Sequence, residues 1–379
     1  MKKKVEDILV EEEITAKKIR EEADASPKVL NAAAQLYAYL RIPKHNWSVW
    51  EKKQLKTQIQ RSINTIARRR IQRIWLAAAS VLIFVASGGI WYIQSTRHID
   101  IKAFAKSIHE NKNDTITRLV LSDIHEVEIS EAESDISYNT KGEEIAIGKS
   151  KKIQQKLETV EPIYNTLTVP YGKRAKITLS EGTMVWLNSG TKMVYPAVFA
   201  ANMREVYIDG EAIFNVSKDP EKTFVVKSHQ FDIEVIGTVF NINAYSSDRN
   251  SSAVLKQGVI KLIRQTKVYL PSENMIISPG EMVTFNPKDE KFQIQKVDPS
   301  DYLSWQYGYY VFRSETLGNI LKRLSRYYNV EIDLKNRQLA LVTFSGRLDL
   351  KSSPEEVLNT IKKTIKLNFN MEGQNIIIY

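Results

Sequence analysis

The residue pair Gly237-Thr238 could carry chemistry, because a hydroxyl follows the least hindered carbonyl that a chain can offer. In a strained turn with a base nearby, the Thr238 hydroxyl can attack the Gly237 carbonyl and move the acyl group from nitrogen to oxygen. Water can then cleave the ester. The alternative is a bulge or turn glycine followed by an ordinary strand threonine. The sequence leaves both open, since no histidine or acid can be assigned beside this bond.

The other reactive residue types form no recognisable enzyme motif. Asp209 and Glu211 flank Gly210, and we expect solvated turn residues there rather than paired catalytic carboxylates. HExxH, GxSxG and glycine-rich phosphate motifs are absent from the sequence. We therefore expect no enzyme apart from possible self-cleavage, and no cofactor or metal. The histidines are scattered along the chain, at His45, His98, His109, His125 and His229.

A long uncharged segment predicts a single transmembrane helix. Residues 74–93 contain no Asp, Glu, Lys, Arg, Asn or Gln. At about 1.5 Å of rise per residue they would extend about 30 Å, the thickness of the hydrocarbon core of a bilayer. Trp75 stands at one end and Trp91-Tyr92 at the other, where amphipathic rings favour the two interfaces. The alternative, a buried core helix, rarely runs uncharged for so long with aromatic rings at both ends.

The charges around this segment predict its orientation. Residues 1–73 carry 17 Lys and Arg against 9 Asp and Glu, which is most of the formal net charge of +10. Because basic flanks stay on the cytoplasmic side, we expect residues 1–73 in the cytoplasm and residues 94–379 on the other side of the membrane. A basic segment beside the membrane favours anionic lipid headgroups over direct nucleic-acid binding. The chain has no cysteine, which excludes disulfides and thiol chemistry.

The cytoplasmic segment is expected to be α-helical. Ser26-Pro27 is a typical helix start, with Ser as the cap and Pro at the first helical position. Asn46 or Ser48 can open a further helix that leads towards the membrane. The apolar faces of these helices favour binding of a protein partner, although the same faces could pack on each other. The residues expected at the binding surface are Leu36, Tyr37, Leu40, Trp47, Trp50 and Leu55.

Beyond the span the pattern changes to β-strands. Residues 94–165 are polar and mixed in charge, with one strand expected at "RLVLSDIHEVEI", and we interpret them as a spacer with some β structure. Residues 166–297 contain many short β-prone runs, such as "KITL", "MVWLN" and "FDIEVI". Turn sequences such as "NSGT" and "KDPE" separate these runs. The pattern predicts an all-β domain, which could be a sandwich, a roll or a solenoid.

Residues 305–379 predict a small α+β domain with the order β-α-β-β-α-β. "YYVF", "VEIDL" and "LVTFSGRL" are strand-like, and "LNFNMEGQNIIIY" predicts a closing strand or hairpin. Ser314 is expected to cap the first helix, and the run from Ser353 to Glu356 is a capping box at the start of the second. Such an order in so few residues predicts two layers, with the helices on one face of the sheet.

Several motifs follow one another in order in the β-rich segment: "VPYG", "WLNSGT", "YP", "REVYIDGEA" and "VIGTVFNINAY". Together they resemble the periplasmic domain of FecR-type anti-sigma regulators. "WQYGYYVF" followed by "LSRYYNV" resembles the C-terminal domain of many of these regulators, itself similar to the short signalling domains of secretins and TonB-dependent transporters. The segment before the membrane carries no typical family motif, and Ile213 stands where the family often has an aromatic residue.

The resemblance implies a signalling function. Residues 1–73 would hold an extracytoplasmic-function sigma factor, and the C-terminal domain would contact the signalling domain of an outer-membrane TonB-dependent transporter. Regulated proteolysis, with an intramembrane protease as a partner, would release the sigma factor. Some regulators of this type are reported to self-cleave at a Gly-Thr pair that matches Gly237-Thr238. The alternative function is a membrane-anchored envelope adaptor that docks on a secretin or transporter and has no transcriptional role.

The end of the sequence suggests how the transporter could be bound. Two small α+β domains with open sheets can add strands to one another at their edges. The terminal run "NIIIY" is apolar and β-prone, so we expect it to form such an edge. The residues predicted to dock on the transporter are Ile376, Ile377, Ile378 and Tyr379.

Overall fold

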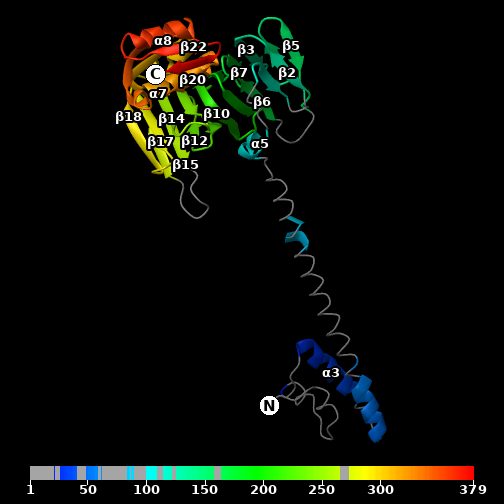
Figure 1. Ribbon diagram of the computed structural model, residues 1–379. Coiled ribbons are helices and arrows are strands. Elements are labelled where there is room, and N and C mark those ends of the chain that lie inside the picture. The colour runs from blue at the N-terminus through cyan, green and yellow to red at the C-terminus, as the bar shows by residue number, and fades with distance from the viewer. Residues whose placement is uncertain are drawn as a thin grey trace. The chain divides into compact units, whose positions relative to one another are not determined.

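The computed structural model divides into two compact units, Met1–Arg97 and His98–Tyr379, each of which is described by itself (Figure 1). The structure describes residues 21, 26–40, 48–58, 61, 83–85, 87–88, 100–108, 114–121, 125–157, 164–264 and 273–379.

The described part of the first unit is helical. Helix α3 spans Pro27–Leu40 and begins directly after Ser26, which confirms the start predicted from the Ser-Pro pair. Residues 49–58 form a further helix, and Ser48 rather than Asn46 opens it. The Ser48 N–H donates to the Glu51 carboxylate at 2.8 Å and the Glu51 N–H donates to the Ser48 hydroxyl at 3.3 Å, which is a capping box.

The predicted transmembrane segment lies mostly outside the described residues. Of residues 74–93, only 83–85 and 87–88 are described, and these are helical. Within the described ranges, no helix combines the length and the apolar content that a membrane crossing requires. The transmembrane helix therefore stays a prediction.

The second unit opens with the short helix α5 (Ile101–Ser107). Ile101 and Ala105 of this helix are buried against Val194 and Tyr207. The Lys102 ammonium lies 2.7 Å from the carboxylate of the buried Asp232. Apolar packing and an ion pair thus both fix α5 to the strands that follow.

Among the described residues, eighteen strands follow α5 in one hydrogen-bonded sheet, which we call the large β domain. This confirms the all-β prediction for the described part of residues 166–297. The strands are β1 (Thr117–Val120), β2 (Glu126–Ile129), β3 (Glu133–Tyr138), β4 (Glu144–Ile147), β5 (Lys151–Gln154), β6 (Tyr164–Val169), β7 (Arg174–Thr178), β8 (Met184–Leu187), β9 (Thr191–Pro196), β10 (Met203–Asn215), β11 (Thr223–Lys227), β12 (Asp232–Val235), β13 (Val239–Ala244), β14 (Ser251–Gln257), β15 (Ile260–Arg264), β16 (Glu273–Ile277), β17 (Glu281–Asn286) and β18 (Lys291–Lys296).

The sheet folds into two layers that share the long strand β10. The first half of β10 pairs with β9 and β11, and the second half pairs with β8 and β13. Because side chains alternate along a strand, Val206, Ile208, Ala212 and Phe214 all face the core between the layers. Residues on the opposite face, including Tyr207 and Ile213, contact α5 and the C-terminal domain instead.

The sequence Asp209-Gly210-Glu211 is not a turn, so that prediction was wrong. The strand continues through Gly210, where it passes from one layer to the other with a φ of 139°. An added Cβ at Gly210 would lie 2.4 Å from Thr191 Oγ1, so only glycine fits this crossing. A glycine between two charged residues is typical of a turn, but here it serves a close approach of two strands.

Residues 94–165 are more than a spacer, because their strands β1–β5 belong to the large β domain. The run "RLVLSDIHEVEI" forms two antiparallel strands, β1 and β2, rather than one. β1 pairs with β6, and β3 pairs with β7 in parallel. Leu119, Ile136 and Ile145 are buried in the same core as the later strands. The polar composition concealed these strands, since only alternate residues face the core.

The chain then enters a second region of mixed structure, residues 299–379, which we call the C-terminal domain. Figure 1 shows it in orange and red beside the strands of the large β domain. Its elements are α6 (Pro299–Leu303), the 3₁₀ helix η1 (Ser304–Tyr307), β19 (Tyr309–Thr316), α7 (Leu317–Tyr328), β20 (Glu331–Leu334), η2 (Leu339–Leu341), β21 (Thr343–Asp349), α8 (Pro354–Lys362), β22 (Phe369–Glu372) and β23 (Asn375–Ile378).

The C-terminal domain has two small sheets instead of the single sheet we expected. β19 pairs with β21, while β23 lies between β20 and β22. The closing segment is a hairpin, so the order becomes β-α-β-β-α-β-β. The capping box at Ser353 is confirmed, but the N-cap of α7 is Thr316 rather than Ser314. Ser314 has a φ of 50° at an irregularity of β19, and it is therefore unsuited to a cap.

Candidate functional site

A buried carboxylate, Glu211, lies where the large β domain meets the C-terminal domain. Glu211 is 2% exposed and accepts hydrogen bonds from Asn188 Nδ2 at 2.8 Å and Asn241 Nδ2 at 3.3 Å. Asn188 Nδ2 also donates to the Tyr310 hydroxyl at 3.2 Å, and Trp305 Nε1 donates to Asn241 Oδ1 at 3.3 Å. Glu211 therefore orients two amides towards the C-terminal domain. We call these five residues the interdomain joint.

The charge of Glu211 acts on groups of the C-terminal domain. Burial raises the pKa of the Tyr310 phenol, and the nearby Glu211 carboxylate raises it further. Burial lowers the pKa of the Arg323 guanidinium, but the negative charge of Glu211, with smaller contributions from Tyr310 and Glu315, outweighs burial, so that this pKa is raised. Arg323 therefore stays cationic and balances the buried carboxylate across the joint.

A second contact, the Arg326 clamp, holds α7 against the large β domain. Arg326 is 7% exposed, its Nη1 donates to Asp248 Oδ2 at 2.9 Å, and its guanidinium lies 3.7 Å from the centre of the Tyr245 ring. Lys322 Nζ donates to the same carboxylate at 3.2 Å. Burial raises the pKa of Asp248, but the hydrogen bonds and charges of Arg326 and Lys322 outweigh burial and hold it below its usual range. We infer a strong ionic contact between the two domains.

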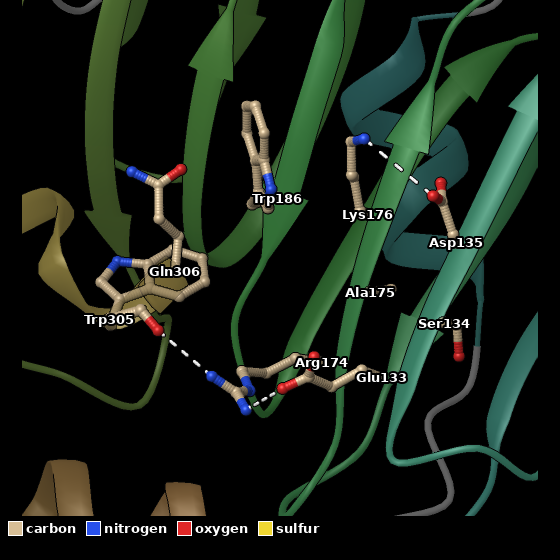
Figure 2. Close-up of a pocket in the computed structure, with 9 residues that line it drawn as sticks. All are labelled: Glu133, Ser134, Asp135, Arg174, Ala175, Lys176, Trp186, Trp305 and Gln306. Atoms are coloured by element: carbon tan, nitrogen blue, oxygen red, sulfur yellow. Dashed lines mark hydrogen bonds and ion pairs between the residues drawn. The ribbon is translucent and has the colours of Figure 1, made fainter. Parts of the chain in front are cut away.

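An open trough of about 290 Å³ lies at the border of the joint, between β3, β7 and β8 on one side and η1 on the other (Figure 2). Arg174 forms an ion pair with Glu133, and its Nη1 donates to the Trp305 carbonyl at 3.1 Å. Figure 2 shows the Trp186 indole standing between Gln306 and Lys176. The residues that line the trough are Glu133, Ser134, Asp135, Arg174, Ala175, Lys176, Trp186, Trp305 and Gln306.

The predicted self-cleavage pair Gly237-Thr238 lies in the link between β12 and β13. Thr238 is 3% exposed, and its hydroxyl donates to the Val259 carbonyl at 3.1 Å. An added Cβ at Gly237 would lie 2.8 Å from Lys218 Cα, so close packing explains the glycine. Among the described residues, no acid or imidazole is hydrogen-bonded to the Thr238 hydroxyl. The hydroxyl is thus held in place, but the group it contacts is a carbonyl rather than a base.

Gly258 packs on the other side of the same peptide bond. An added Cβ at Gly258 would lie 2.7 Å from Thr238 Oγ1 and 2.8 Å from the Gly237 carbonyl oxygen. Gly258 has a φ of 95°, in the left-handed region that favours glycine. The Thr238 hydroxyl and the Gly237 carbonyl, which are the reacting groups of the predicted cleavage, therefore both lie beside Gly258.

The residues predicted to bind a sigma factor are partly described. Leu36 is 42% exposed and Trp50 is 66% exposed, while Tyr37 and Leu55 are half-buried. Leu40 belongs to α3, but its side chain lies outside the described residues, as does Trp47 altogether. The two exposed apolar side chains lie on different helices, so either helix could contribute to a binding surface.

The predicted docking residues Ile376–Tyr379 do not form an open edge. β23 is the central strand of its sheet, hydrogen-bonded to β20 on one side and to β22 on the other. Ile376 and Ile378 are buried in the core of the C-terminal domain. Strand addition at β23 is therefore excluded, because both rows of its backbone groups already have partners. A short apolar strand is as typical of a sheet centre as of an edge.

Neither the interdomain joint nor the Arg326 clamp was predicted from the sequence. Glu211 was interpreted as a solvated turn residue, and no pairing was predicted for Asp248. A usable indication was present in "WLN" and "VFNIN", where Asn188 and Asn241 interrupt apolar strands. Buried amides require hydrogen-bond partners, so two such residues predict a buried polar group between them.

Comparison with known proteins identifies the two domains. Residues 165–261 match the family described as FecR protein, and residues 309–378 match the family described as FecR, C-terminal. The chain therefore contains a FecR domain and a FecR C-terminal domain. Its FecR domain contains Glu211 and Gly237-Thr238, and its FecR C-terminal domain contains Tyr310 and Arg326. No curated protein matches the chain.

Two solved structures resemble this chain, both of a candidate anti-sigma factor from Parabacteroides distasonis. The structure at 2.50 Å resolution is 29% identical, covers 57% of this chain and 98% of its own chain, and has a TM-score of 0.52. The structure at 1.65 Å resolution is also 29% identical, covers 56% and 98%, and has a TM-score of 0.52. The likeness extends over nearly the whole of the solved chains.

Proposed function

We propose that this protein is a FecR-type anti-sigma factor that crosses the inner membrane once. Residues 1–73 bind an extracytoplasmic-function sigma factor in the cytoplasm, residues 74–93 cross the membrane, and the FecR domains lie in the periplasm. The likeness to solved candidate anti-sigma factors over 98% of their length supports this proposal most. The uncharged segment and its basic cytoplasmic flank support the topology. A reporter fused to the C-terminus should be active only in the periplasm, and activity in the cytosol would contradict the topology.

The exposed apolar residues of the N-terminal helices support a protein partner. Trp50 and Leu36 each leave a large side chain in solvent, and such residues contribute strongly when an interface covers them. The full chain should copurify with an extracytoplasmic-function sigma factor from its own cell. Trp50→Ala should weaken that copurification, while Lys53→Ala, which changes an exposed residue of the same helix, should not. Equal recovery with all three chains would argue against this surface.

The signal enters, in this proposal, through the FecR C-terminal domain. Its partner is the signalling domain of an outer-membrane TonB-dependent transporter, and an intramembrane protease finally releases the sigma factor. The alternative function is an envelope adaptor without a transcriptional role. Deletion of residues 1–60 should derepress a promoter that depends on the sigma factor. An unchanged promoter would favour the adaptor.

We also propose that the chain cleaves itself after Gly237. The Thr238 oxygen bonds to the Gly237 carbonyl carbon, the carbon–nitrogen bond breaks, and the hydroxyl proton is passed on to the Thr238 nitrogen, which leaves as a free amine. Water then hydrolyses the ester, so that Gly237 ends in a carboxylate and Thr238 regains its hydroxyl. The hydrogen bond that orients Thr238 Oγ1 supports a positioned nucleophile. Denaturing mass analysis after long incubation should find both fragments, and Thr238→Ala should stay intact.

A further inference from the structure

The trough beside the interdomain joint has an ordered floor. Asp135 of β3, Lys176 of β7 and Trp186 of β8 are consecutive partners in the strand register, so their side chains share one face. The same register continues to Ile213 of β10, which the C-terminal domain covers. The trough is therefore the part of this row of side chains that the C-terminal domain leaves open, and Gln306 of η1 lies at its border.

The charges of the trough cancel. Glu133 is paired with Arg174, and Asp135 lies 4.0 Å from Lys176 Nζ. An anionic or cationic ligand would leave one of these groups without a counter-charge, which disfavours a charged ligand. A neutral ligand leaves both pairs balanced. It must nevertheless be polar, because the walls present donors and acceptors side by side.

Three side chains of the trough, Asp135, Lys176 and Gln306, are only loosely engaged in hydrogen bonds. The distance of 4.0 Å between Asp135 and Lys176 is too long for a hydrogen bond, and both side chains are partly exposed. The half-buried Gln306 amide makes no hydrogen bond within the described residues. A carboxylate can accept from hydroxyl groups, an ammonium can donate to them, and an amide can do both. These groups together suit a ligand that carries several hydroxyls.

Trp186 adds an aromatic surface to these polar groups. Figure 2 shows its indole between Gln306 and Lys176, and the Lys176 ammonium lies 5.8 Å from the ring centre. The face of an indole carries partial negative charge, which attracts polarised C–H groups. The apolar face of a sugar ring presents such C–H groups, while its hydroxyls point outwards to the sides. A volume of about 290 Å³ is near the lower limit for small-molecule sites, which suits one or two rings.

We propose that the trough formed by Asp135, Lys176, Trp186 and Gln306 binds a short neutral saccharide. Such a ligand contacts β3, β7 and β8 of the large β domain together with η1 of the C-terminal domain. Binding therefore favours the arrangement in which the C-terminal domain is docked, because only that arrangement presents Gln306 beside Trp186. This site is independent of the proposed sigma-factor binding.

The proposal is tested by calorimetric titration of the purified full chain in a detergent that contains no sugar. The probes are cellobiose, maltose and N,N′-diacetylchitobiose, with adenosine as a flat uncharged comparison and glucuronate as an anionic one. We expect at least one disaccharide to bind with a dissociation constant between about 10 µM and 10 mM, and adenosine and glucuronate not to bind. Binding of adenosine or glucuronate instead of a disaccharide would overturn the proposal, as would no disaccharide binding at about 50 mM.

Substitutions of the lining residues test whether the disaccharide binds in the trough. Gln306→Ala and Asp135→Asn should each weaken disaccharide binding about tenfold. The first removes a hydrogen-bonding amide, and the second replaces a charged acceptor by a weaker neutral one. Neither removes a core side chain. Trp186→Ala should abolish measurable binding. Glu143→Gln changes an exposed residue between β3 and β4, outside the trough, and should leave the affinity unchanged. Unchanged affinity in both Gln306→Ala and Asp135→Asn would mean that the disaccharide binds elsewhere, and the proposal would fail.

Discussion

Asp248→Asn should release α7 from the large β domain. The substitution keeps the shape of the side chain but removes the charge that balances Arg326, which is 7% exposed. Breaking a buried pair from one side costs about 3–5 kcal/mol. The Asp248 side chain keeps 18% of its surface in solvent, and an asparagine can still accept one hydrogen bond, so the cost here should be about 2 kcal/mol. That value corresponds to roughly a thirtyfold increase in the open population of α7.

Hydrogen exchange measured by mass spectrometry is the suitable assay, since it reports opening of individual segments. In Asp248→Asn, peptides of α7 should exchange about thirtyfold faster, while peptides of β10 stay unchanged. Asp333→Asn is the matched control, because Asp333 and Lys335 form an ion pair whose side chains are 53% and 59% exposed. Such exposed pairs contribute about 1 kcal/mol or less. A change of less than about threefold in α7 would refute the reasoning that the clamp holds this helix.

The same clamp predicts a dependence on pH. The pKa of Asp248 is lower in the folded protein than the usual value of 3.8. A carboxylate with a lowered pKa stabilises the folded state above its unfolded pKa, and this contribution is lost as the pH falls through the folded pKa. Protection of α7 should therefore be constant from neutral pH to about pH 5 and decline below about pH 4. In Asp248→Asn, α7 should lack this acid-dependent loss.

Three further substitutions test other parts of the structure. Gly258→Ala should slow cleavage after Gly237 about tenfold, because the new methyl group would lie 2.7 Å from Thr238 Oγ1. A denaturing gel measures this rate, and cleavage at the wild-type rate would exclude a role for this close approach. Gly210→Ala should lower the free energy of unfolding by about 2 kcal/mol or more in urea, owing to its φ of 139° and contact with Thr191. Trp50→Ala should weaken sigma-factor binding about tenfold with unchanged helical circular dichroism.

Local chemistry made several elements predictable. Ser26-Pro27 and the capping box at Ser353 each fix a helix start within a few residues, since the cap bonds are local. The short β-prone runs after residue 166 predicted the β domain, because the alternation of side chains along a strand is also a local pattern. The layer crossing at Gly210 and the central place of β23 were not predictable, because both depend on which distant strands become neighbours.

The site was harder to predict than the fold. The Gly237-Thr238 motif is visible in the sequence, but its closest neighbours, Lys218 and Gly258, come from other strands or turns. The interdomain joint gathers residues that are more than a hundred positions apart, such as Asn188 and Tyr310. Charge and polarity along the chain do not reveal such pairings, since a lone acidic residue is more often exposed than buried.

The pairing of β10 with β13 determines what a cut after Gly237 would look like. β10 precedes the cut and β13 follows it, and their register joins Gly210–Asn215 to Val239–Ala244. The hydrogen bonds from Arg174 to the Trp305 carbonyl and from Gly172 to the Arg326 carbonyl also join the two sides. Two polypeptides produced in this way would sediment and elute together. A single peak in size-exclusion chromatography under native conditions would therefore not show whether the backbone is intact.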